Sequence, residues 1–122
     1  MTAMEAIGAA DKLYPNIYNV STKYAWLEQL ENMIRTEILL RYDAEAPEIE
    51  PFAAGEGERE LLVGAPYDEM YIFWLTAKMH YFLREDEAFN DANAMFESMF
   101  KGYRNEYNRT HMPLTAKKKY LT

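Results

Sequence analysis

Hydrophobic residues recur at helical spacing in the first third of the chain. Residues 2–12 are rich in Ala and Glu, and Pro15 ends the helix that they predict. The polar stretch "NVST" offers Ser21 or Thr22 as the N-cap of a second helix, which is expected to end near Arg41. Apolar side chains spaced by three and four residues give this helix a buried stripe: Tyr24, Leu27, Leu30, Ile34 and Ile38, widened by Trp26, Met33 and Leu40.

A third helix is predicted after Pro66, which suits a first helical position. Asp68 and Glu69 then lie near the positive end of the helix dipole. No Gly or Pro occurs from Tyr67 to Lys101, and this favours a helix over the strand that the run "MYIFWL" could otherwise form. The predicted helix is apolar on nearly every side, so it must be surrounded by other elements.

A fourth helix is predicted after a break near residues 85–87, and Pro113 prevents its continuation. Residues at spacings of four and three form a narrow, mainly aromatic seam along it: Phe89, Asn93, Phe96, Phe100, Tyr103 and Tyr107. Asn93 either sets the register of the seam or lies at its edge in water, and the edge position is the favoured interpretation. The stretch "YNRTHMP" is then a helix C-terminus, with Arg109 and His111 near the negative end of the dipole.

A long acidic loop, residues 43–66, separates the second and third predicted helices. Its part from Asp43 to Glu60 holds seven acidic residues against Arg59 alone, a net charge of seven minus one, or −6. Loops of this length in compact domains are typically functional or disordered, and a short extended piece is expected within this one. The pattern as a whole predicts an all-α fold: a small bundle of about four helices in one domain, residues 1–113, followed by a flexible basic tail, residues 114–122.

Composition narrows the classes of function. The 122 residues are 49% hydrophobic, which is enough for one domain with its own core. The chain has no cysteine, so disulfides and thiolate–metal sites are excluded. A net charge of −7 without a basic face disfavours binding to duplex DNA. No apolar run has the length of a signal peptide or membrane span, so we expect a protein made and used inside a cell, which weakens the glycosylation patterns at Asn19 and Asn108.

The search for chemistry gives no candidate catalytic or metal site. Di-iron helical bundles need Glu-x-x-His pairs, but Ala77 stands three residues before His80, and Asn108 three before His111. The chain lacks a nucleophile-elbow pattern, and acidic residues on helix surfaces are ordinary. We therefore expect no catalysis, no cofactor and no metal, with His80 a satisfied core or interface residue.

One ion pair is predicted on the surface of the second helix. Glu31 and Arg35, four residues apart, are expected to form an exposed pair worth about 0.3–0.5 kcal/mol.

Aromatic and methionine side chains are unusually frequent for a chain of this size. Ten tyrosines, two tryptophans and eight methionines exceed what a few short helices readily bury. Because these residue types are enriched at protein–protein contacts, the excess favours an oligomer.

Three blocks of the sequence resemble the small helical head–tail connector, or adaptor, proteins of tailed bacteriophages and their prophages. They are "YPNIYNVSTKYAWLEQLENMIRTEIL", "LLVGAPYDEMYIFWLTAKMHYF" and "YNRTHMP". The resemblance covers most of the chain apart from the acidic segment 43–60 and the lysine tail, and its specificity lies in order and spacing. It is strongest at Trp26–Glu28 with Glu31 and Glu37, at residues 65–69, and at residues 107–113. Between the last two helices we expect a small turn residue, often Gly, where this chain has "RED".

The resemblance implies a structural role in the virion neck, after synthesis in the bacterial cytoplasm. Such proteins dock on the portal vertex as a ring of about twelve copies and carry the next neck or tail component. DNA passes through the channel, no membrane is involved, and the acidic loop is expected to order on contact and to face that channel. The residues expected to make contacts are Trp26, Tyr71, Trp74, Arg109, His111, Lys117, Lys118 and Lys119. The alternative is a phage-encoded helical protein-binding module, regulatory or host-directed, that acts as a monomer or dimer.

Overall fold

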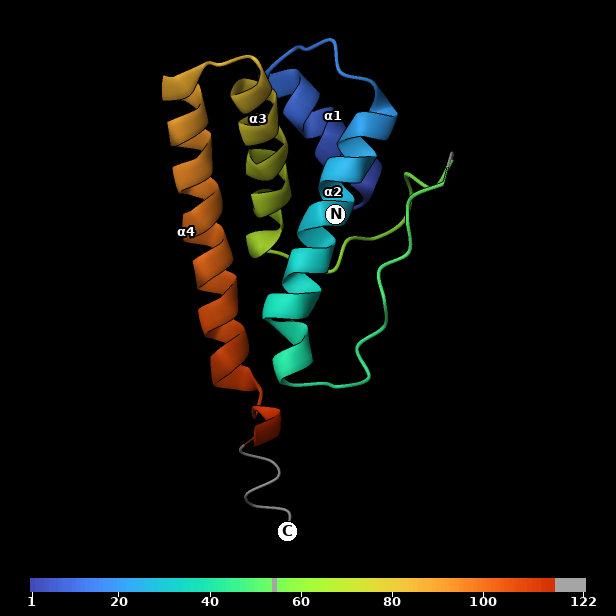
Figure 1. Cartoon of the computed structure of the whole chain (residues 1–122), viewed down its shortest axis with the longest axis vertical. Helices are drawn as coiled ribbons and strands as arrows, with labels where there is room; N and C mark the ends of the chain where they lie inside the picture. The colour runs from blue at the N-terminus through green and yellow to red at the C-terminus, as the bar shows by residue number, and fades with distance from the viewer. Residues whose placement is uncertain (54, 116–122) are drawn as a thin grey trace.

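The computed structural model describes residues 1–53 and 55–115, and within them the chain is all-helical with no sheet, as predicted (Figure 1). The four α-helices are α1 (Ala3–Leu13), α2 (Val20–Glu37), α3 (Met70–Phe82) and α4 (Asp86–Thr110). Short 3-10 helices at Leu39–Arg41 and Tyr67–Glu69 extend α2 and precede α3. None of these helices is long and apolar enough to cross a membrane.

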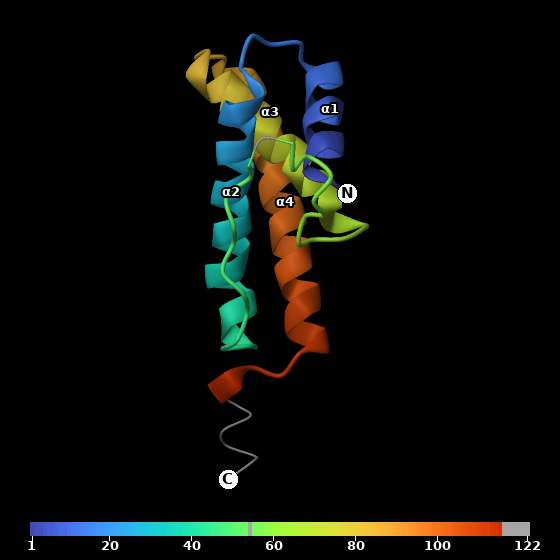
Figure 2. The ribbon, with the colours of Figure 1, turned by 90° about the vertical axis from the view of Figure 1, so that its right-hand side faces the viewer.

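Helix α3 lies at the centre of the bundle. It packs against α1 and α2 on one side and along the much longer α4 on the other (Figures 1 and 2). The side chains of Met70, Tyr71, Leu75 and Met79 are fully buried, so the other helices cover part of this nearly all-apolar helix. Ile72, Phe73 and Trp74 are half-buried and Phe82 is exposed, so one copy of the chain does not surround it completely. Its start differs from the prediction: Pro66 precedes a 3-10 turn rather than opening the α-helix.

Helix α2 buries the predicted stripe, since all five of its principal members are buried: Tyr24, Leu27, Leu30, Ile34 and Ile38. The predicted N-cap was wrong. The Asn19 side chain accepts a hydrogen bond from the backbone N–H of Thr22 (2.9 Å), and the Ser21 and Thr22 hydroxyls also donate to Asn19 Oδ1. The α-helix ends at Glu37, and the 3-10 turn carries the chain to Arg41, close to the expected end.

Helix α4 packs its aromatic seam against the bundle. Phe96 and Phe100 are buried, whereas Asn93 is half-buried and contacts Glu97, in agreement with the edge position favoured above. The α-helix ends at Thr110 with His111 as its C-cap, so "YNRTHMP" is a helix C-terminus as predicted. The predicted basic tail falls mostly on residues 116–122, which lie outside the described part of the chain.

The acidic loop is held against the bundle by its backbone. The Phe52 N–H donates to Glu28 Oε1 of α2 (2.6 Å), and Ala46 O accepts a hydrogen bond from the Arg35 side chain of α2. Within the loop, the Arg59 side chain donates to Glu50 O. The expected extended piece is an isolated antiparallel bridge between Thr2 and Glu60. The expectation that this loop orders only on contact with a partner is not supported, because these bonds lie within one chain.

The turn between α3 and α4 is a Schellman motif with Arg84 in the left-handed position. The Glu85 N–H donates to His80 O (3.0 Å) and the Arg84 N–H to Tyr81 O (3.1 Å), and Arg84 has a φ of 59°. Glycine adopts this conformation without steric cost, which explains why a small turn residue was expected here. Arginine closes the turn nonetheless, with backbone strain of about 1–2 kcal/mol.

Replacing Arg84 with glycine is expected to raise the free energy of unfolding by about 0.5–1 kcal/mol. The gain is smaller than the strain because glycine also has more freedom in the unfolded chain. Chemical denaturation followed by circular dichroism measures the change. As a control, Ala94→Gly on the exposed side of α4 should destabilise by about 0.5–1 kcal/mol. An Arg84→Gly variant no more stable than the parent would contradict the assignment of strain.

Candidate functional site

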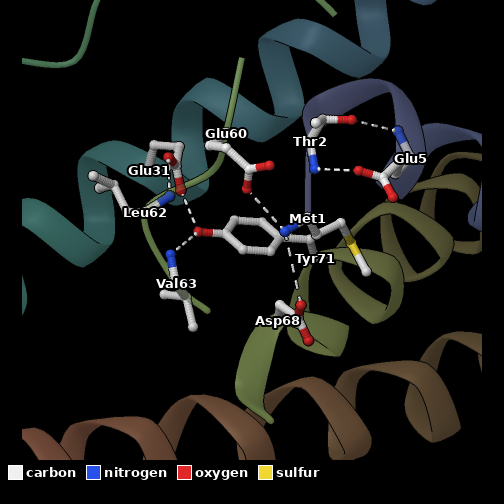
Figure 3. Close-up of polar contacts among 9 residues, drawn as sticks. All are labelled: Met1, Thr2, Glu5, Glu31, Glu60, Leu62, Val63, Asp68 and Tyr71. Atoms are coloured by element: carbon white, nitrogen blue, oxygen red, sulfur yellow. Dashed lines mark hydrogen bonds and ion pairs between the residues drawn. The ribbon is translucent and has the colours of Figure 1, made fainter. Parts of the chain in front are cut away.

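A buried polar cluster joins the acidic loop to α2 and α3 (Figure 3). The Tyr71 hydroxyl donates to Glu31 Oε1 (2.5 Å) and accepts from the Val63 N–H (3.0 Å), while Glu31 Oε2 accepts from the Leu62 N–H (3.0 Å). Both carboxylate oxygens of Glu31 are therefore occupied by donors of the chain itself. The cluster fixes residues 61–63 against the core, next to the N-terminal amine of Met1, whose nitrogen lies 3.0 Å from Glu60 Oε2.

The environment of this cluster disfavours negative charge. Burial raises the pKa of the Glu31 carboxyl, and the hydrogen bonds from Tyr71 and Leu62 oppose that effect only in part. Burial, followed by the nearby Glu31 charge, raises the pKa of the Tyr71 hydroxyl. The pair acts as a structural tie between the loop and the helices.

The prediction of an exposed Glu31–Arg35 ion pair was wrong. Glu31 is 4% exposed, and Arg35 instead donates to the backbone of the acidic loop. The signal was present in the sequence, because position 31 falls four residues after Leu27 and three before Ile34, within the apolar stripe. A glutamate on a buried stripe needs buried donors, which neighbouring positions in the sequence do not reveal.

Exposed apolar side chains gather at one end of the bundle. Six of the ten exposed large hydrophobic residues in the described part lie where α1 ends, α2 begins and α3 turns into α4 (Figure 1, top). Ile17 is 94% exposed and Leu13 67%, and Tyr81 and Phe82 are each more than half exposed. We call these residues the apolar end: Leu13, Ile17, Val20, Tyr81, Phe82 and Leu83. Exposed apolar side chains concentrated in one region are typical of a contact with another protein.

The two tryptophans predicted to make contacts lie together beside the apolar end. Trp26 is buried and stacks on Phe82 with ring centroids 5.8 Å apart. Trp74 is half-buried, and its Nε1 donates to the backbone oxygen of Trp26 (2.7 Å). Trp26 therefore packs under one residue of the apolar end, Phe82. Of the two tryptophans, Trp74 is the one that is partly accessible to solvent.

A hollow of about 320 Å³ opens beside Trp74, between α3 and α4. We call it the Lys78 pocket, lined by Trp74, Ala77, Lys78, Tyr81, Phe89 and Asn93. Lys78 Nζ lies 4.6 Å from the centre of the Trp74 ring, and partial burial lowers the pKa of this ammonium group. Sequence reasoning missed Lys78, because the pocket forms only where two helices meet.

The remaining residues predicted to make contacts do not form one site. Tyr71 is fully buried in the polar cluster, so it is not available to a partner in this fold. Arg109 and His111 are exposed at the far end of α4, where the His111 ring stacks on Tyr107 at 3.7 Å. Lys117, Lys118 and Lys119 lie outside the described residues.

His80 is satisfied within the chain. Its Nδ1 lies 3.2 Å from Glu85 Oε1, its ring lies 4.4 Å from that of Tyr14, and the Tyr14 hydroxyl donates to the same carboxylate. In residues 1–53 and 55–115, no group of three or more His, Asp or Glu side chains could hold a metal ion.

Comparisons with protein-family models, with curated proteins and with solved structures each found no match to this chain.

Proposed function

We propose that this protein is a structural component of a phage neck, a head–tail connector that docks on the portal vertex as a ring. It would link the filled capsid to the next neck or tail component by contacts alone, without a cofactor. The proposal begins from the order and spacing of the three sequence blocks that resemble connector proteins. The all-α bundle is the architecture that the resemblance leads us to expect.

The apolar end is the observation that carries the proposal. Four different segments bring exposed large apolar side chains to the same end of the bundle, and Ile17 at 94% exposed buries almost none of its side chain within the chain. Covering such side chains is favourable by about 25 cal/mol per Å² of apolar surface removed from water. A protein that works by docking makes use of this surface.

A closing ring also needs two different surfaces on each copy, because each subunit meets its neighbours head to tail. The apolar end lies at one extremity of the long axis, whereas the acidic loop lies along the flank beside α2 (Figures 1 and 2). In the proposed ring the apolar end contacts the portal, and the flanks contact neighbouring copies.

The proposal is tested by mixing the purified chain with the portal ring of the phage that encodes it. We expect electron microscopy to show added density on one face of the portal, with subunits related by the portal's own symmetry. The variant Leu13→Glu/Ile17→Glu should keep the circular dichroism of the parent, since both positions are exposed, and should lose portal binding at least tenfold.

The matched control is Met4→Glu/Met112→Glu, which places the same two charges on exposed apolar positions outside the apolar end. It should bind the portal like the parent. A tight dimer that ignores the portal would contradict the connector and favour the helical protein-binding module. Equal binding by the Leu13→Glu/Ile17→Glu variant would move the docking surface elsewhere.

A further inference from the structure

The Lys78 pocket has the composition of a site for a small apolar group beside a negative charge. Trp74, Tyr81 and Phe89 contribute aromatic surface, and Lys78 contributes a positive charge at the rim. Among the described residues, no carboxylate lies within ion-pair distance of the Lys78 ammonium group, although the chain carries 20 acidic residues. A partly desolvated cation with no carboxylate beside it favours an acidic ligand.

The acidic loop displays side chains of the complementary kind. Hydrogen bonds from Arg35 to Ala46 O and from the Phe52 N–H to Glu28 fix its backbone against α2, and Arg59 of the loop itself donates to Glu50 O. Between these points the side chains of Pro47, Glu48, Glu50 and Pro51 are exposed. Extended segments with prolines dock in aromatic-lined grooves, because the proline ring packs flat on an aromatic face and the backbone has little entropy to lose.

We propose that the Lys78 pocket binds the acidic, proline-containing segment 46–51 of a second copy of this chain. A proline ring packs between the aromatic side chains, and Glu48 or Glu50 pairs with Lys78. The inference rests on the proposed ring in that it needs a neighbouring copy within reach.

The occupant is a second copy because the chain's own loop lies on the side of the bundle opposite the Lys78 pocket. In both views the loop follows the outer side of α2, whereas α4 lies on the opposite side of the bundle (Figures 1 and 2). Helix α2 therefore stands between the loop and the pocket formed by α3 and α4. A contact between two different surfaces of identical chains is the head-to-tail kind that builds closed rings.

The test titrates a capped peptide spanning Asp43–Ala53 into the full chain labelled with ¹⁵N. We expect shifts at the Trp74 indole N–H and at the backbone amides of Lys78 and Asn93, with a dissociation constant of about 0.1–1 mM for so few anchoring groups. The variant Lys78→Glu should weaken binding at least tenfold. The control Lys101→Glu makes the same charge change at an exposed position of α4 outside the pocket and should leave binding within about twofold of the parent.

Changes in the peptide test the same contact without altering the fold of the chain. Pro47→Ser/Pro51→Ser should weaken binding, and a peptide carrying Glu48→Lys and Glu50→Lys should bind Lys78→Glu better than it binds the parent. Absence of shifts at about 5 mM peptide, or shifts that survive Lys78→Glu, would overturn the inference. If portal rings recruit subunits while the peptide fails to bind, only this inference fails; if the peptide binds while the portal recruits nothing, only the neck function fails.

Discussion

Replacing Glu31 with alanine is expected to lower the free energy of unfolding by about 3–5 kcal/mol. The substitution leaves the buried Tyr71 hydroxyl and the part-buried Leu62 N–H without their acceptor. Each buried polar group left unpaired costs about 1–3 kcal/mol, and the lost side chain adds a cavity. Chemical denaturation of both proteins at neutral pH measures the difference.

The control for this prediction is Glu37→Ala, which removes an exposed carboxylate from the same helix and should change stability by less than about 0.5 kcal/mol. Tyr71→Phe tests the partner side, because it leaves the Val63 N–H without an acceptor. In a double-mutant cycle, Glu31→Ala and Tyr71→Phe should couple by at least about 1 kcal/mol. Additive effects would contradict the described hydrogen bond between the two side chains.

Replacing Trp74 with alanine is expected to cost about 2–4 kcal/mol of stability. The indole ring lies 5.0 Å from that of Phe96, and its N–H is bonded to Trp26 O, so the substitution loses packing between α3 and α4 and a tie to α2. Replacing a fully buried tryptophan with alanine costs about 3–5 kcal/mol. Because Trp74 is only half-buried, the expected loss is smaller. Thermal and chemical unfolding provide the measurement.

Trp74→Phe separates the two contributions, because it keeps an aromatic ring and removes the N–H donor. We expect it to cost about 1 kcal/mol, the usual net value of one hydrogen bond. A change near zero for Trp74→Ala would show that α3 and α4 are held together without this ring, and would also weaken the case for a formed Lys78 pocket.

The excess of aromatic and apolar residues that favoured an oligomer is divided by the fold into two groups. Tyr24, Tyr42 and Tyr71 are buried, so one copy covers much of its own aromatic surface. Ile17, Tyr81 and Phe82 remain exposed at the apolar end. The proposal of a docking protein therefore depends on where the exposed residues lie rather than on how many aromatic residues the chain has.

Periodicity predicted the helices well, because it is a local property. The spacing of Leu27, Leu30 and Ile34 sets which face of α2 is buried, whatever covers that face. Two other local features also agree with the structure: α3, apolar on nearly every side, lies at the centre, and α4 ends before Pro113. The misplaced N-cap arose because Asn19, Ser21 and Thr22 are all able to cap, and it is Asn19 whose side chain accepts from the Thr22 N–H.

The sequence by itself determined an all-α bundle, an acidic loop between its second and third helices, and helix ends to within a few residues, since each follows from neighbours along the chain. Only the tertiary structure decided that Glu31 is buried beside Tyr71, that Lys78 borders an aromatic pocket, and that exposed apolar residues from the ends of α1 and α3 and the start of α2 lie at the same end of the bundle. These features join residues tens of positions apart, and the packing of whole helices, which no local pattern specifies, brings them together.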